Sequence, residues 1–103
     1  MPNLGNLVKQ AEQMQRRMAE TQAQLSARTV DASSGGGAVK VVATCDGTLV
    51  SINIDPQAIN PSEAQLLEEM VLAAANSALA KGREVSQSEL AKVTAGLKLP
   101  GLF

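Results

Sequence analysis

Apolar residues in the first quarter of the chain recur at alternating steps of three and four. They are Leu4, Leu7, Ala11, Met14, Met18 and Leu25, and Thr21 occupies the remaining position of the same seam. This spacing is typical of the a and d positions of a heptad, so it predicts one long amphipathic helix over residues 4–28. In the same frame Lys9 and Arg16 fall at position f, which predicts that they point away from the seam, and Arg17 lies beside them at position g.

Between residues 29 and 55 the pattern changes to alternation, which predicts a three-stranded antiparallel meander. A short strand at 29–33 is followed by a glycine turn at 34–37 and a hairpin over 38–55. Asp46-Gly47 is a strong signal for a two-residue type I′ turn. The predicted register pairs Cys45 with Thr48, Ala43 with Val50, Val41 with Ile52 and Val39 with Ile54. This register places nearly all strong apolar residues on one face.

The sequence Asn60-Pro61-Ser62-Glu63 is typical of a helix start, with an N-cap residue, a proline in the first turn and a glutamate three residues on. The helical region predicted over 61–94 is apolar on one broad face and also on the opposite side, at Leu72, Ala75 and Leu79. Gly82 and a second capping pattern at Ser86 leave two alternatives, one continuous helix or a kink or break between them.

These elements predict a single domain of the α+β class over residues 1–103: a long N-terminal helix, the meander, and a long C-terminal helix. We expect residues 95–103 to be an apolar tail outside the helix, with Phe103 packing back onto a helix. Because the second helix is apolar on opposing sides, the hairpin and first helix cannot cover it all. We therefore expect a homodimer.

The composition excludes several kinds of chemistry. The chain has no histidine and one cysteine, which excludes a Cys-His dyad, a Ser-His-Asp triad and a typical zinc site. On the apolar face of the hairpin, Cys45 is expected to be a small buried hydrophobe. We predict no enzyme activity, no cofactor, no metal and no small-molecule substrate. Without a membrane-length apolar run or a signal-peptide layout, we expect a cytoplasmic protein with no membrane partner.

The net charge of −1 conceals a pattern along the chain. Residues 1–30 carry four basic and two acidic side chains, residues 31–80 one basic and six acidic, and residues 81–103 four basic and two acidic. Counting along both helices from the sheet predicts that Lys9 is level with Ala80, close to Lys81 and Arg83. In a two-fold dimer these cations would be doubled on projecting arms, a layout suited to contacting phosphates.

Several segments resemble the YbaB/EbfC family of nucleoid-associated proteins, in order and spacing over almost the whole chain. They are N-L-V-K-Q-A-E-Q-M-Q-R-R-M (6–18), G-G-G-A-V-K-V (35–41), I-D-P (54–56), A-A-A-N-S-A-L (73–79) and G-L-K-L-P-G (96–101). The resemblance implies a small, tweezer-like bacterial dimer that binds double-stranded DNA and helps organise the nucleoid. Its DNA-contacting residues would be Lys9, Arg16, Arg17, Lys81, Arg83 and Lys92.

Two observations shape this hypothesis. The chain has no Trp or Tyr, so it lacks the stacking platforms typical of proteins that bind single strands or RNA. The chain is also slightly acidic overall, unlike a typical DNA-binding protein. An alternative is therefore a protein-interaction adaptor that uses its long helices and apolar tail, with DNA binding incidental. The salt dependence of duplex binding separates the two.

Overall fold

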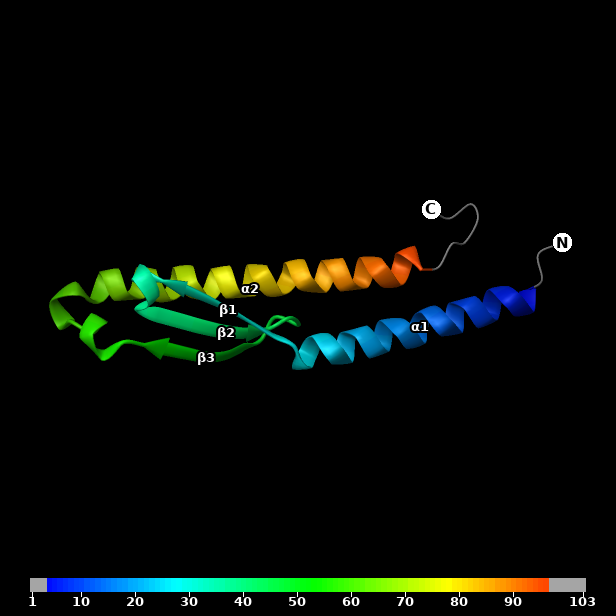
Figure 1. Cartoon of the computed structure of the whole chain (residues 1–103), viewed down its shortest axis with the longest axis horizontal. Helices are drawn as coiled ribbons and strands as arrows, with labels where there is room; N and C mark the ends of the chain where they lie inside the picture. The colour runs from blue at the N-terminus through cyan, green and yellow to red at the C-terminus, as the bar shows by residue number, and fades with distance from the viewer. Residues whose placement is uncertain (1–3, 97–103) are drawn as a thin grey trace.

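The computed structural model describes residues 4–96, in which two long helices accompany a three-stranded sheet (Figure 1). The elements in order are α1 (Leu4–Ala27), β1 (Thr29–Ser34), β2 (Val39–Thr44), β3 (Leu49–Ile54) and α2 (Ala64–Ala95), with single 3-10 turns at Gly35–Gly37, Pro56–Ala58 and Pro61–Glu63. The predicted α+β class and element order are confirmed. Of the two alternatives for the last helix, the continuous one is observed.

The sheet is antiparallel with the order β1-β2-β3, so β1 and β3 form its two edges. Val39 pairs with Ile54 and Val41 with Ile52, as predicted. Beyond Val42 the register shifts, and Ala43 pairs with Leu49 rather than with Val50. The predicted register is wrong from this point to the turn.

The hairpin turn explains the shift. The Thr44 N–H donates to the Thr48 carbonyl at 2.8 Å and the Gly47 N–H donates to the Thr44 carbonyl at 3.2 Å, which encloses a loop of Cys45, Asp46 and Gly47. Within residues 4–96 only glycines have positive φ, and Gly47 has +95°. A type I′ turn needs positive φ at both central residues, so the observed turn is instead a three-residue loop closed by a left-handed glycine, with a bulge in the strand.

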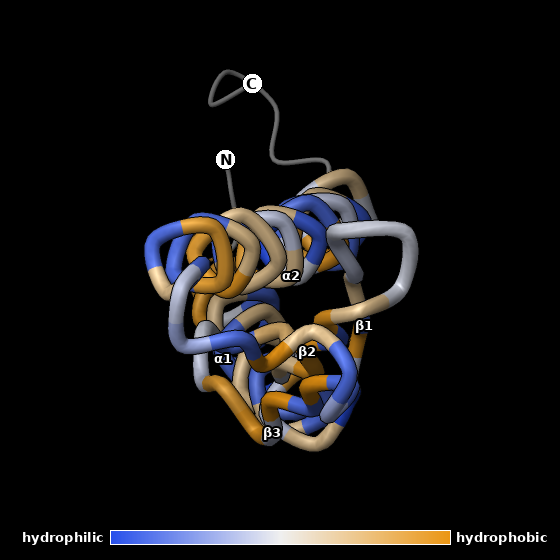
Figure 2. The backbone as a smooth tube through the Cα atoms, turned by 90° about the vertical axis from the view of Figure 1, so that its left-hand side faces the viewer, coloured by the Kyte–Doolittle hydropathy of each residue, from blue (hydrophilic) through white to orange (hydrophobic). Residues whose placement is uncertain are grey.

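The core lies between α2 and the inner face of the sheet (Figure 2), and α2 runs along the length of the sheet (Figure 1). The core consists of small and branched residues: Ala32, Val39, Val41, Ala43, Ala74 and Ala78. α2 packs mainly on β1 and β2 and touches β3 much less. One edge of the inner face, along β3, is therefore left open.

Gly82 continues this small-residue side of α2 and is buried. A Cβ atom added there would lie 3.0 Å from the Thr44 carbonyl oxygen and 3.3 Å from the Cys45 Cα. The helix is therefore so close to the sheet that a larger side chain at this position would require the backbone of the hairpin turn to shift. Packing against the sheet compensates for the low helix propensity of glycine, which accounts for the helix continuing past it.

The molecule is elongated, with extents of 73 × 22 × 16 Å. Its radius of gyration is 20.1 Å, whereas a compact domain of about 100 residues has about 13 Å. α1 causes much of this length, because it extends beyond the sheet and beyond the end of α2 (Figure 1). The predicted tail lies outside the described residues from position 97 onward.

Candidate nucleic-acid interface

The hairpin turn holds the carboxyl end of α1. The backbone N–H of Cys45 donates to the carbonyls of Leu25, at 3.2 Å, and of Arg28, at 3.0 Å. The Leu25 side chain is buried beside it, and the Arg28 guanidinium lies 3.6 Å from the Glu89 carboxylate on α2. These contacts fix the direction in which α1 leaves the sheet. They involve Arg28, a cation that was not predicted from the sequence to belong to the site.

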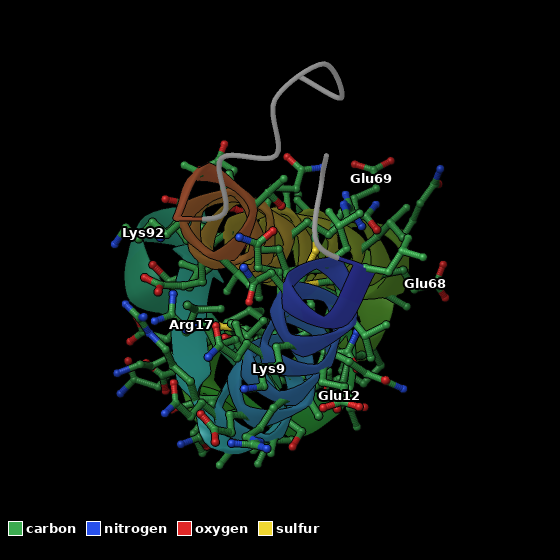
Figure 3. The ribbon with its side chains drawn as sticks, turned by 90° about the vertical axis from the view of Figure 1, so that its right-hand side faces the viewer. Lys9, Glu12, Arg17, Glu68, Glu69 and Lys92 are labelled. Carbon is green, nitrogen blue, oxygen red and sulfur yellow. The ribbon has the colours of Figure 1, made fainter. Side chains whose placement is uncertain are left out.

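α1 and α2 run antiparallel, and α2 ends opposite the middle of α1. A Cβ atom added to Gly96 would lie 3.2 Å from Arg17 Nη1, so the guanidinium sits beside the last turn of α2. The carboxyl end of a helix carries partial negative charge, which favours a cation there. Lys92 is exposed on the same last turn, with its Nζ 3.2 Å from Glu89 Oε1. Seen end-on, Arg17 and Lys92 lie on one side of the molecule and Glu68 and Glu69 on the other (Figure 3).

Lys9 and Arg16 are exposed on α1. Within residues 4–96 no carboxylate lies within salt-bridge distance of either side chain. Figure 3 shows Lys9 on the side of α1 turned away from α2, in agreement with its predicted heptad position. These two cations, with Arg17 and Lys92, make up what we term the arm cluster.

Lys81 and Arg83 lie elsewhere, beside the sheet. Lys81 Nζ donates to the Asp31 carbonyl on β1 at 3.0 Å. Arg83 borders a shallow hollow next to the hairpin turn, with Cys45 and Gly47. Both side chains are exposed. We refer to them as the sheet-side cations.

The expectation that Lys9 lies close to Lys81 and Arg83 is therefore wrong. Arg17 is level with Gly96, so Lys9 lies about 12 Å further out along α1, and Lys81 about 22 Å back along α2, at 1.5 Å per residue. The count from the sequence assumed that α1 ends, and α2 begins, at the same end of the sheet. Instead the first half of α2 lies along the sheet, and only its second half accompanies α1 (Figure 1).

A second surface feature is apolar. A groove of about 510 Å³ opens between β3 and α2 and is lined by Leu49, Ile52, Ile54, Leu67, Glu68, Val71, Leu72 and Ala75. Leu72 is 62% exposed and Ile52 is 46% exposed. The sequence indicated apolar residues on this side of α2, but the bulge that brings Leu49 into the groove was not predicted.

Residues 4–96 contain no buried polar or charged side chain and no group of three or more potential metal ligands. Neither helix of that region is long and apolar enough to cross a bilayer. What the surface provides is exposed cations, which can bind a polyanion without any chemical step.

The fold and the arm cluster together define a small α+β protein whose projecting helix carries exposed cations. A crystal structure of an uncharacterized protein from Helicobacter pylori has a similar fold, with a TM-score of 0.77 over 93% of this chain and 100% of that one, at 20% identity. The model of the YbaB/EbfC DNA-binding family matches residues 1–97. The chain belongs to this family.

Curated relatives agree with the family assignment. A nucleoid-associated protein of Caldanaerobacter subterraneus subsp. tengcongensis is 46% identical over 101 residues, covering 98% of this chain and 91% of the relative. A nucleoid-associated protein of Acetivibrio thermocellus is 47% identical over 102 residues, covering 98% and 90%. The resemblance inferred from the sequence segments is thus confirmed.

Proposed function

We propose that this protein binds double-stranded DNA as a homodimer, mainly through the arm cluster, and helps organise or bend DNA in the bacterial nucleoid. Membership of a DNA-binding family supports DNA as the partner. The observation that carries the assignment of the site is the position of Lys9 and Arg16. They are exposed, lack a carboxylate partner within residues 4–96, and belong to the helix that projects beyond the sheet (Figure 1).

A duplex supplies regularly spaced phosphates, and lysine and arginine side chains bind them by neutralising charge and releasing counterions. Such contacts position a protein without reading sequence. Arg17 and Lys92 would extend the contact toward the sheet. Lys81 and Arg83 would form a secondary contact, reached only if the duplex approaches the sheet.

Dimerisation is supported by surface that one chain leaves uncovered. The groove between β3 and α2 is largely apolar, and β3 is an edge strand with unpaired backbone groups. A second copy placed there would bury the groove and double the arm cluster by two-fold symmetry. Two arms contacting one duplex would hold it more tightly than one and provide a means of bending it.

The alternative function is a protein-interaction adaptor. It is favoured by the exposed apolar residues Leu4, Leu7 and Val8 at the free end of α1. In that case DNA binding would be weak and would not depend on the arm cluster.

The test is a gel shift with a mixed pool of duplexes at two salt concentrations. The proposal predicts binding to most members of the pool, with affinity falling steeply as salt rises. The logarithm of affinity should fall by about 0.9 per neutralised phosphate for each unit of log salt. Binding that is absent at low salt, or insensitive to salt, would contradict the proposal and favour the adaptor.

A further inference from the structure

The seam of α1 becomes progressively uncovered toward its N-terminus. Leu25 is 3% exposed, Met18 and Met14 are half-buried, Leu7 is 42% exposed and Leu4 is 74% exposed. The reason is that α2 ends opposite Arg17. The first turns of α1 therefore carry an apolar stripe that no other element of residues 4–96 covers. We term this stripe the free seam and define it as Leu4, Leu7 and Ala11, which are all exposed.

We propose that the chain's own C-terminal segment, residues 97–103, lies along the free seam. Its sequence is Leu-Lys-Leu-Pro-Gly-Leu-Phe, which is apolar at four of seven positions even before the proline is counted. It starts from Gly96, next to Arg17, at the point where coverage by α2 ends. The segment would replace α2 as the partner of the seam.

Direction and length both fit this placement. α2 runs toward the free end of α1 at the point where it ends (Figure 1). From Arg17 to Leu4 the axis of α1 spans about 20 Å, at 1.5 Å per residue. Seven residues in extended form reach about 23 Å. The segment is long enough to reach Leu4 and has little excess.

The sequence of the segment also suits an extended partner. Pro100 disfavours helical geometry at the residue before it and lacks an N–H for a helical bond. In extended chain, alternate side chains share a face, so Leu97, Leu99 and Phe103 would face the seam while Lys98 faces solvent. The stripe formed by the a and d positions of α1 is narrow. A single extended segment can cover such a stripe, and a broad sheet or helix surface is not needed.

This contact would hold the projecting part of α1 as a helix and fix the orientation of Lys9 on its opposite face. The contact itself is intramolecular and does not depend on the proposed DNA binding. Its test therefore needs no DNA, and its failure would leave the DNA proposal standing.

The first experiment is cross-linking between introduced cysteines, in the full chain carrying Cys45→Ala. In extended form Leu99 would lie about 10 Å beyond Gly96, roughly level with Ala11. Ala11→Cys is therefore combined with Leu99→Cys, and the control pairs Lys9→Cys, on the opposite face of α1, with Leu99→Cys.

Under mild oxidation the Ala11 pair should form an intrachain disulfide and the Lys9 pair should not. Equal yields for both pairs, or no bond in either, would overturn the proposal. Bonds between chains would overturn it in favour of a second copy on the seam.

The second experiment keeps the length of the chain and replaces Leu97, Leu99, Leu102 and Phe103 with serine. Amide hydrogen exchange in residues 5–14 should become roughly tenfold faster, because this part of α1 would no longer be covered. Exchange in β2 and in residues 20–27 of α1 should not change, which controls for general unfolding. Unchanged exchange in residues 5–14 would overturn the proposal.

Discussion

Gly82 shows how a single missing methyl group sets the distance between α2 and the sheet. A Cβ there would lie 3.0 Å from the Thr44 carbonyl oxygen, a backbone atom held by the hairpin. Gly82→Ala should therefore destabilise the protein by about 1–3 kcal/mol through overpacking, although alanine is the better helix former. Urea unfolding followed by circular dichroism measures the change.

The matched control is Ser88→Ala, an exposed position on the same helix. There the better helix propensity acts without a clash, so the free energy of unfolding should stay the same or rise slightly. A Gly82→Ala variant as stable as the parent would show that α2 can move off the sheet at no cost.

Cys45 is 3% exposed, and its backbone N–H joins the hairpin turn to the end of α1. The native thiol should therefore react with a soluble disulfide reagent far more slowly than the same thiol in urea. Labelling at comparable rates in both conditions would contradict this burial. Cys45→Ala should cost on the order of 1 kcal/mol, because the backbone contact is kept.

The sequence allowed the burial of Cys45 to be predicted but not the turn beside it. Asp46-Gly47 is compatible with a two-residue type I′ turn and with a three-residue loop that ends in a left-handed glycine. The three-residue loop needs positive φ only at Gly47, whereas the type I′ turn also needs it at Asp46. Because aspartate tolerates positive φ, the local sequence cannot distinguish the two turns. The three-residue loop is observed together with a bulge in the strand pairing, which brings Leu49 opposite Ala43.

At the level of elements, α1 is anchored by its last turn. Leu25 is the one residue of α1 that is buried within residues 4–96. Leu25→Ala should lower the free energy of unfolding by about 3 kcal/mol, as expected for a buried leucine replaced without refilling the space. Gln24→Ala, at an exposed neighbouring position, should change the stability by less than about 0.5 kcal/mol. Equal effects would show that the helix is not anchored at this position.

Helices and strands were predictable because their patterns are local. The heptad seam of α1, the alternation of β2 and the cap at Asn60 each report on a few consecutive residues, and Asn60 Oδ1 does accept from the Ser62 N–H at 3.1 Å. The relative level of the helices was not predictable in this way. It depends on α2 crossing the sheet, which small residues such as Ala74 and Gly82 permit but do not specify.

For the whole molecule, the proposed dimer makes a specific prediction about α2. Leu72 lines the apolar groove, whereas Leu66 is half exposed on the same helix without lining it. Leu72→Glu should shift the protein toward monomers in sedimentation at low micromolar concentration, because it would bury an unpaired charge. Leu66→Glu adds the same charge and should leave two chains per particle. A parent protein that sediments as a monomer would contradict the dimer.

The charge pattern of the whole chain was predictable from the sequence, but its layout in space only in part. Basic residues near both ends suggested one cluster, and the structure divides them into the arm cluster and the sheet-side cations. The Lys81 side chain donates a hydrogen bond to the Asp31 carbonyl on β1, far from Lys9. No local pattern indicates this division, because it arises from the packing of α2 on the sheet.

The most direct test of the arm cluster as the DNA site compares two variants that each remove two positive charges. Lys9→Gln with Arg16→Gln neutralises two exposed cations of the arm cluster. Lys40→Gln with Lys81→Gln neutralises two exposed lysines at the sheet, one on β2 and one next to β1. Surface charges contribute little to stability, so both variants should unfold like the parent.

Duplex affinity is measured against salt concentration for the parent and both variants. The arm variant should bind more weakly, with a salt slope smaller by about 0.9 for each phosphate that it no longer neutralises. The sheet variant should stay closer to the parent in both affinity and slope. An arm variant with the parent's affinity and salt slope would contradict the assignment of the arm cluster as the DNA site.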